Sequence, residues 1–115
     1  MEEETIFDKI IAGELPSDKV YEDEHVLAFR DINPQAPVHV LVVPKVKVKD
    51  FTALQESDAC KTGLFFKAVS KVATILELDK NGYRIVLNCG EDGQQTVEYL
   101  HAHILGDRKM SWPPG

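Results

Sequence analysis

The chain has 115 residues, of which 43% are hydrophobic and 28% are charged, a composition typical of a folded globular protein. Its formal net charge of −6 argues against a general nucleic-acid binder, because such proteins present a basic face. No apolar run is long enough to span a membrane, and the acidic residues 1–4 do not resemble a secretory signal. We therefore expect a single domain over residues 1–115, in the cytoplasm with the nucleus as an additional location, without nucleic-acid or membrane partners.

The first predicted element is a short amphipathic helix. Ile6, Phe7 and Ile10 recur at helical spacing, and Thr5 can cap the start of the helix together with Asp8. We interpret the apolar stripe as core packing, with the wall of an apolar pocket as the alternative.

Three strands are expected next, and the first two, at about residues 19–22 and 26–30, form a hairpin. Asp31 follows the second strand, at a position where loops commonly hold ligands. The alternative is that its carboxylate bonds only the backbone of its own turn. The apolar, β-branched residues 38–43 predict a strand buried on both faces, in which His39 is the exceptional polar side chain.

A long helix is expected over about residues 57–78, followed by a strand over residues 83–88. The helix is indicated by an apolar stripe at helical spacing: Phe65, Val69, Val72 and Leu76. The polar loop 89–96 contains two glycines and leads into the last strand. We interpret its backbone N–H groups and the Thr96 hydroxyl as a phosphate-binding loop, with an ordinary turn as the alternative.

The last predicted strand, from Tyr99 to Leu105, carries two histidines on one face. Side chains alternate along a strand, so Tyr99, His101 and His103 share one face and the intervening apolar residues share the other. A central strand could place His39 beside them. Imidazole can act as a nucleophile, a proton carrier or a metal ligand, so we expect a functional site on this face.

The order of these elements predicts an α+β fold, in which a curved antiparallel sheet carries one long and one short helix. We expect both helices on one face of the sheet and the histidines on the other. Three chemistries remain open for the histidine face. They are a metal site, with Cys89 as a conceivable fourth ligand, nucleophilic attack by a neutral imidazole on phosphorus, and binding without turnover.

Several motifs together resemble the Hint branch of the histidine-triad (HIT) superfamily. Residues 99–105, with the sequence YLHAHIL, resemble the signature of three alternating histidines, with tyrosine in place of the first histidine. Residues 5–16, 28–39 and 42–45 and the ending 105–115 follow the same branch. The resemblance spans almost the whole chain.

The resemblance implies a homodimer in which two five-stranded sheets join into a continuous ten-stranded sheet. It also implies hydrolysis of purine nucleoside phosphoramidates through a nucleotidyl-histidine intermediate, with AMP or GMP as the product ligand. We expect no required cofactor and no dedicated metal ligands, and adventitious zinc at the histidines is left open. The alternative functions are a dinucleoside polyphosphate hydrolase and a nucleotide-binding or interaction protein with weakened catalysis.

The resemblance also assigns roles to residues. His101 corresponds to the nucleophile, His103 to a phosphate contact and His39 to a supporting histidine, and Tyr99 completes the catalytic group. Asp31 corresponds to a binder of the ribose hydroxyls, and Trp112 lies in a tail that reaches the partner subunit in the family. The first helix becomes a wall of the base pocket. The expected nucleotide-binding residues are Ile6, Phe7, Ile10, Phe29, Arg30, Asp31, Ile32, Asn88, Gln94, Gln95, Thr96 and Trp112.

Three residues raise questions of detail. Gln94 stands where the family usually has glycine, and Arg30 beside Asp31 can alter the base or ribose preference. Tyr99 keeps a hydrogen bond through its hydroxyl but cannot supply an imidazolium. If position 99 orients the His101 ring through its backbone carbonyl, activity should survive the change; if it acts through its side chain, the enzyme should be weakened. We predict that activity is retained, with a reduced rate as the alternative.

Overall fold

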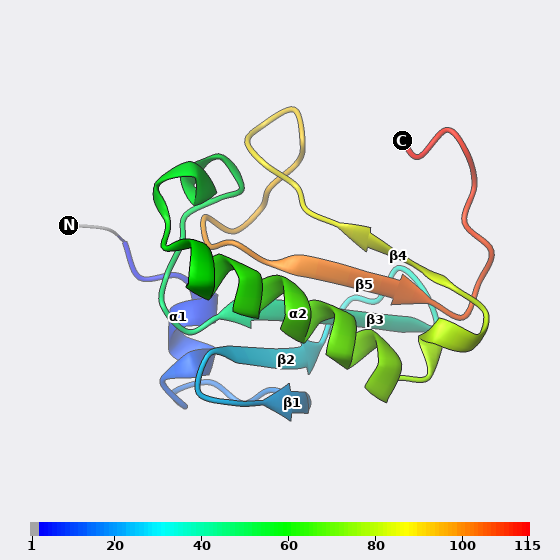
Figure 1. The fold of residues 1–115 in the computed structure, drawn as a ribbon, viewed down its shortest axis with the longest axis horizontal. Helices are drawn as coiled ribbons and strands as arrows, with labels where there is room; N and C mark the ends of the chain where they lie inside the picture. The colour runs from blue at the N-terminus through cyan, green and yellow to red at the C-terminus, as the bar shows by residue number, and fades with distance from the viewer. Residues whose placement is uncertain (1–2) are drawn as a thin grey trace.

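The computed structural model describes residues 3–115, and within that range five strands form one antiparallel sheet in the order β1-β2-β3-β5-β4 (Figure 1). The bounds of the strands are β1 Lys19–Glu22, β2 Val26–Arg30, β3 Val38–Pro44, β4 Tyr83–Val86 and β5 Ala102–Gly106. This architecture confirms the α+β prediction. The expectation about a secretory signal concerns in part Met1 and Glu2, which lie outside the described residues.

The described part of the chain also contains two α-helices and two short 3-10 helices. The helix α1 Ile6–Ile11 precedes β1, and the segment between β3 and β4 holds η1 Thr52–Glu56, α2 Ala59–Ile75 and η2 Leu78–Lys80. The predicted capping box of α1 is present, because the Asp8 N–H donates to the Thr5 hydroxyl and the Asp8 carboxylate accepts from the Thr5 N–H. At α2 the Asp58 carboxylate accepts from the Lys61 N–H at 2.9 Å. None of the helices within residues 3–115 is long and apolar enough to cross a membrane.

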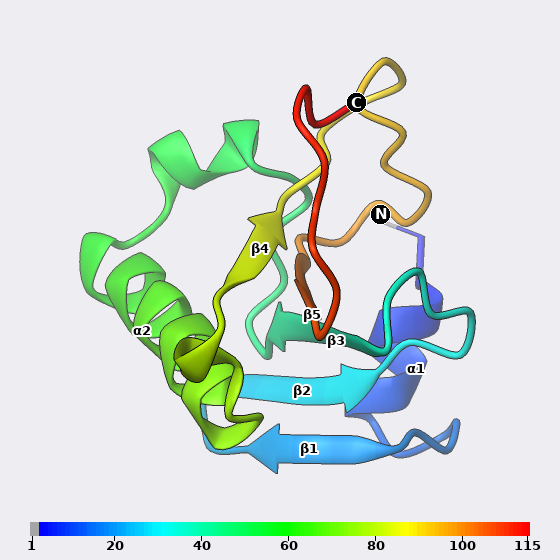
Figure 2. The same ribbon diagram turned by 90° about the vertical axis from the view of Figure 1, so that its right-hand side faces the viewer.

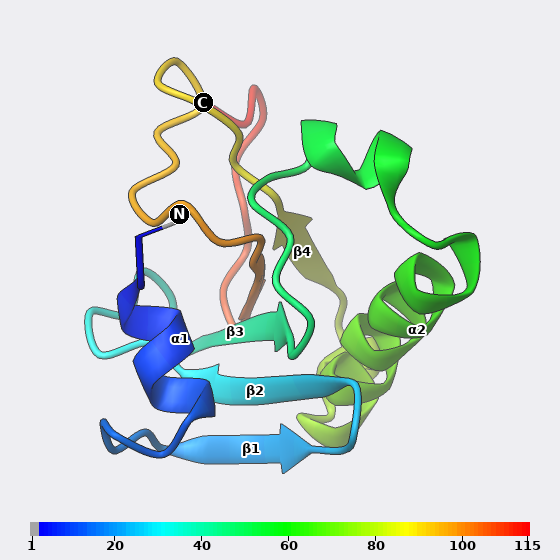
Figure 3. The same cartoon turned by 90° about the vertical axis from the view of Figure 1, so that its left-hand side faces the viewer.

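The helices α1 and α2 cover opposite faces of the sheet, so the expectation that both lie on one face is wrong (Figures 2 and 3). The reason is that β2 and β3 are apolar on both faces and each face needs a cover. On one face α2 packs Phe65, Val69 and Val72 into the larger core cluster. On the other face α1 packs Phe7 and Ile10 into a smaller cluster with Leu27, Phe29, Leu41, Val43 and Tyr99.

The last strand begins later than predicted, at Ala102, so Tyr99 and His101 lie in the segment that precedes β5. The predicted alternation nevertheless holds. Leu100 belongs to the core cluster on the α2 face, whereas Tyr99 belongs to the cluster on the α1 face. The Leu100 N–H donates to the Val48 carbonyl at 2.7 Å, and this bond holds the segment without a strand ladder. The fourth strand also ends two residues earlier than predicted.

Candidate active site

Three histidines meet on the α1 face of the sheet. His39 and His103 lie on the neighbouring strands β3 and β5, whose antiparallel register directs both imidazoles to the same face. His39 Nε2 lies 2.9 Å from His103 Nδ1. The centroids of the His101 and His103 rings are 4.9 Å apart. The structure thus brings together the three histidines that the sequence singled out.

The His101 ring is fixed in one orientation and one tautomer. Its Nδ1 lies 2.7 Å from the Tyr99 carbonyl oxygen. Because a carbonyl only accepts hydrogen bonds, Nδ1 carries the proton and Nε2 keeps a lone pair. The edge of the Phe7 ring packs against the imidazole, with 4.9 Å between the ring centroids. Burial lowers the pKa of His101, although the bond to Tyr99 and the charge of Asp31 oppose the shift, so the ring is neutral at pH 7.

A chain of hydrogen bonds also fixes the tautomers of the other two histidines. The Gln35 N–H donates to His39 Nδ1 at 3.0 Å, so the proton of His39 is on Nε2 and points to His103 Nδ1. The proton of His103 is therefore on its own Nε2, which is buried and has no hydrogen-bond partner within residues 3–115. Burial, together with His101 and His39, lowers the pKa of His103 to about 4. His103 is thus neutral, and its Nε2–H is available to donate a hydrogen bond to a ligand.

Asp31 combines the two roles that the sequence left as alternatives. Its Oδ1 accepts from the Asn33 N–H at 2.8 Å, which bonds its own turn. Its Oδ2 lies 3.4 Å from His39 Nε2, at the edge of the histidine cluster. Burial lowers the pKa of His39, while the charge of Asp31 opposes the shift. The turn bond holds the carboxylate in place beside the histidines.

The Tyr99 side chain is part of the core under the histidines. Only 1% of the residue is exposed, its hydroxyl donates to the Pro44 carbonyl, and its ring meets Phe7 edge to face. The Lys47 ammonium lies 5.7 Å from the centroid of the Tyr99 ring and 3.0 Å from the Asp8 carboxylate. Burial raises the pKa of the phenol, so it stays neutral. Tyr99 therefore ties α1 and the end of β3 to the segment that carries His101.

The predicted nucleotide-binding residues divide into a buried group and an exposed group. Phe7, Ile10 and Phe29 pack in the cluster under α1, next to the histidines. Ile6 and Thr96 share a shallow surface hollow. The remaining apolar residues lie outward, since Ile32 is 97% exposed and Trp112 is 80% exposed. The Arg84 guanidinium lies over the Trp112 ring, 5.9 Å from its centroid. Arg30 is also exposed and pairs with Asp18 at 3.7 Å.

The loop 89–96, which precedes the segment with His101, is stabilised by hydrogen bonds of the Gln95 side chain. The Gln95 amide donates to the carbonyls of Lys49 and Val97, both at 3.0 Å, so its side chain holds the loop together. Gln94 has a φ of 58°, a left-handed conformation that glycine adopts at less cost, as expected for a position where the family usually has glycine. Asn88 is half-buried just beyond the end of β4.

The sequence pattern of the HIT domain matches residues 12–110. The chain belongs to the HIT domain family. A Zea mays protein named 14 kDa zinc-binding protein is 51% identical over 113 residues, which cover 96% of this chain and 88% of the relative. The crystal structure of a HIT family hydrolase from Legionella pneumophila superposes with a TM-score of 0.92 at 40% identity, covering 97% of this chain and 100% of that one. A histidine triad nucleotide-binding protein from Candida albicans superposes with a TM-score of 0.81 at 31% identity, covering 96% and 83%.

The relative named for zinc raises the question whether this HIT protein could hold a metal ion. One ligand atom from each of Asp31, His39 and His103 lies within 4.8 Å of the others, and this oxygen and nitrogen set suits zinc. A metal on His39 Nε2, however, would require the ring proton on Nδ1, where the Gln35 N–H already donates. The cluster therefore fits zinc only after the turn that contains Gln35 moves.

Sequence reasoning missed two residues that shape the HIT site. Gln35 acts through its main-chain N–H, for which no side-chain pattern exists to be recognised. Lys47 lies in an alternating run of lysines and valines, a pattern typical of a solvated edge or a phosphate-steering patch, yet its side chain is partly buried against Tyr99 and Asp8. The contacts of Lys47 with Asp8 and Tyr99 exist because α1 lies on the histidine face, and the sequence does not predict on which face α1 lies.

Proposed function

We propose that this HIT protein hydrolyses purine nucleoside phosphoramidates to a nucleoside monophosphate and an amine. The orientation of His101 carries the proposal, because the Tyr99 carbonyl holds Nδ1 and leaves a neutral Nε2 as a nucleophile. The similarity to a HIT family hydrolase and to a histidine triad nucleotide-binding protein supports the substrate class. We also propose that residues 1–115 form a single HIT domain.

The first step is attack by the Nε2 lone pair of His101 on the α-phosphorus. An Nε2–P bond forms as the P–N bond to the amine breaks, and the amine leaves with a proton that it already carries or that a general acid supplies. The His101 ring becomes positively charged in the nucleotidyl-histidine adduct. The Tyr99 carbonyl, 2.7 Å from Nδ1, stabilises that charge through the N–H that it accepts.

The second step is attack by water on the same phosphorus. A P–O bond to the water oxygen forms as the Nε2–P bond breaks, and the water releases a proton to the solvent. The nucleoside monophosphate leaves and His101 returns to its neutral form. In both steps the phosphoryl oxygens accumulate negative charge. The Nε2–H of His103, which has no partner among the described residues, is a suitable donor to one of them. His39 supports that donor by accepting from Gln35 and donating to His103. Asp31 Oδ2 is a suitable acceptor for a ribose hydroxyl.

The remaining nucleotide-binding assignments concern the base and the phosphate side. In this proposal Phe7, Ile10 and Phe29 form the floor under the nucleotide, and Ile6 and Ile32 cover the base from the surface. Arg30, Asn88, Gln94, Gln95 and Thr96 are assigned to the polar rim. Ile32 is almost fully exposed and so is accessible to the base. A purine stacked on it would bury that apolar surface.

We also propose that the protein acts as a homodimer. β4 is an edge strand of the sheet, with one side left unpaired in the described chain, and such an edge can pair with its copy. The elements α2 and β4 also carry exposed apolar side chains, which a partner could cover: Leu64, Phe66, Ile75 and Tyr83. A dimer through this edge would bring Trp112 towards the second subunit. Sedimentation equilibrium tests this proposal, because Phe66→Glu should shift the mass to that of a monomer and the exposed control Lys67→Glu should not.

Release of AMP from an AMP–lysine phosphoramidate is the measurement that tests the function. The wild-type protein should turn it over, and His101→Ala should reduce the rate by about 10³-fold or more, since the nucleophile is lost. Quenching the wild-type reaction should trap AMP on the peptide that contains His101. Full activity in His101→Ala, or an adduct on another residue, would contradict the proposed mechanism. Comparing this rate with that on a diadenosine polyphosphate separates the proposal from the second hydrolase class.

A further inference from the structure

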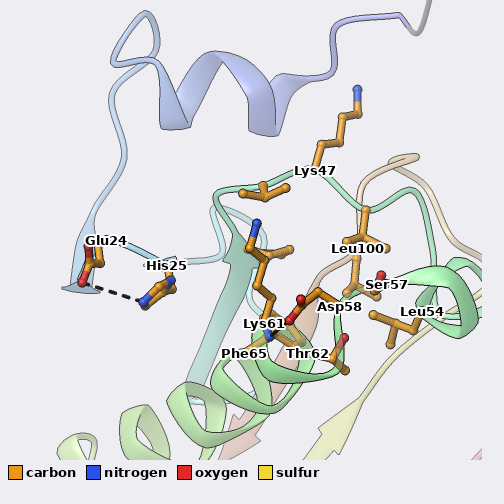
Figure 4. A pocket seen from close by; sticks show the side chains of 13 residues that line it. Glu24, His25, Lys47, Leu54, Ser57, Asp58, Lys61, Thr62, Phe65 and Leu100 are labelled. Carbon is orange, nitrogen blue, oxygen red and sulfur yellow. Dashed lines mark hydrogen bonds and ion pairs between the residues drawn. The ribbon is translucent and has the colours of Figure 1, made fainter.

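A cavity of about 230 Å³ opens on the face of the sheet that α2 covers, and none of the three site histidines lines it (Figure 4). Its walls come from the turn between β1 and β2, the segment after β3, the 3-10 helix η1 and the first turns of α2. Leu100, which directly precedes His101, contributes to its floor. This cavity is therefore separate from the proposed nucleotide site and lies behind it.

The floor of the cavity is apolar and well packed. Phe65 and Leu100 are buried members of the core cluster under α2, and Val48 and Leu54 are partly buried against that cluster. An apolar cavity of about 150 Å³ can hold a benzene molecule. The larger volume here therefore has room for one aromatic ring with a short substituent.

The mouth of the cavity is lined by charges of both signs, and one cation among them is available to a ligand. Lys61 lies on the rim, and its ammonium makes no hydrogen bond or ion pair with any residue in the described range 3–115. The carboxylate of Asp58 is occupied by the cap of α2, and that of Glu24 lies 3.8 Å from His25. The ammonium of Lys47 points away towards α1, where it pairs with Asp8 (Figure 4). Lys61 is thus the cation at this mouth that a ligand can bind.

We propose that this cavity binds a small aromatic monocarboxylate, with its ring on Phe65 and Leu100 and its carboxylate at the Lys61 ammonium. The Thr62 side chain also lines the cavity and adds a polar group to its wall. An apolar floor with a few convergent polar groups is the usual composition of a small-molecule site. The site is independent of the proposed hydrolase function, since neither its floor nor its rim contains a residue assigned to catalysis.

Fluorine NMR with 4-fluorobenzoate as the probe tests the site directly. The wild-type protein should broaden the probe signal in a saturable way, and Lys61→Gln should weaken binding by about tenfold or more, as expected for loss of a charged hydrogen bond. The matched control is Lys67→Gln, because Lys67 is exposed on the same helix but does not line the cavity. Equal binding to wild type and Lys61→Gln, or no binding to wild type, would overturn the proposal.

Two further arms distinguish the ligand class and the location. 4-Fluorobenzyl alcohol should bind at least about tenfold more weakly than the carboxylate, and 4-fluorobenzylamine should bind more weakly still. Equal binding of the amine would overturn the assignment of an anion. Saturating AMP should leave the bound probe in place; if AMP displaces it, the probe occupies the histidine site and the cavity is not its binding site. Leu54→Phe, which fills the floor with a larger side chain, should abolish the signal change.

Discussion

The main-chain carbonyl of Tyr99 accepts a 2.7 Å hydrogen bond from the Nδ1–H of His101, while the Tyr99 side chain points into the core and binds the Pro44 carbonyl. The orientation of His101 therefore depends on the backbone at position 99. The side chain at this position contributes by holding that backbone in place. Two substitutions at Tyr99 can separate the two contributions.

Tyr99→Phe should lower the stability of the fold more than it lowers the rate of AMP release. Loss of the hydroxyl leaves the buried Pro44 carbonyl without a donor, which costs about 1–3 kcal/mol in the free energy of unfolding. The backbone bond to His101 remains, so kcat should fall less than about threefold, which corresponds to about 0.65 kcal/mol in the activation free energy. Denaturant unfolding and turnover measure the two effects. Tyr21→Phe, which removes a part-buried bond to Asp23 and a long contact with the exposed Lys71, is the matched control and should cost less than about 1 kcal/mol.

Tyr99→His tests whether the side chain takes part in catalysis. Because the carbonyl of residue 99 is retained, we expect kcat on an AMP–lysine phosphoramidate to stay within about threefold of the wild-type value. The comparison should be made on protein whose unfolding midpoint has been checked, since the imidazole cannot reproduce the bond of the phenol to Pro44. A gain in rate of tenfold or more would show that an imidazole at position 99 serves the reaction directly.

Acid should reduce both activity and stability, and the direction follows from the lowered pKa values of the histidines. His101 attacks in its neutral form, and its pKa lies below the ordinary 6.5, so kcat/KM should be constant near pH 7 and fall only below about pH 6.5. His103 has its pKa lowered to about 4, so the unfolded chain binds more protons than the folded chain between about pH 6.5 and 4. Stability should therefore be complete above pH 6.5 and decline towards pH 4. A pH–rate profile with its acidic midpoint above 6.5 would contradict this assignment.

Removal of divalent metal should leave turnover unchanged. The proposed reaction uses only side chains and water, and a metal on His39 would conflict with the Gln35 N–H. Dialysis against EDTA should therefore change kcat by less than about twofold. Added zinc should inhibit turnover, because zinc bound to Asp31, His39 and His103 would break the hydrogen bonds from Gln35 to His39 and from His39 to His103. Loss of activity in EDTA, restored by zinc, would show a required metal.

The sequence predicted those parts of the molecule that follow from local patterns. The bounds of β1 and β2 agree with the predicted ranges, and the Thr5 and Asp8 capping box is present as expected. These features depend on residues within a few positions of one another, where alternation and capping rules apply directly. Membership of the HIT family, inferred from its motifs, is confirmed as well.

Other features could not be predicted because they depend on contacts between distant segments. Periodicity shows that α1 has an apolar face, but it does not show which side of the sheet that face covers. Phe7 packs against His101 because α1 lies on the histidine side. The donor to His39 is the main-chain N–H of Gln35, and side-chain patterns contain no information about it. The exposure of Ile32 and Trp112 follows from loop and tail conformations that no periodic signal determines.

The hydrogen bond from the Leu100 N–H to the Val48 carbonyl makes this amide a reporter of local opening at the site. Because residues 99–101 precede β5, they can separate from the segment after β3 while the strand ladder stays intact. Deuterium should therefore replace the Leu100 amide proton sooner than it replaces the protons within β3 and β5. Ligands on either face of this segment should slow that exchange, so a single amide can report occupancy of the front and of the back of the sheet.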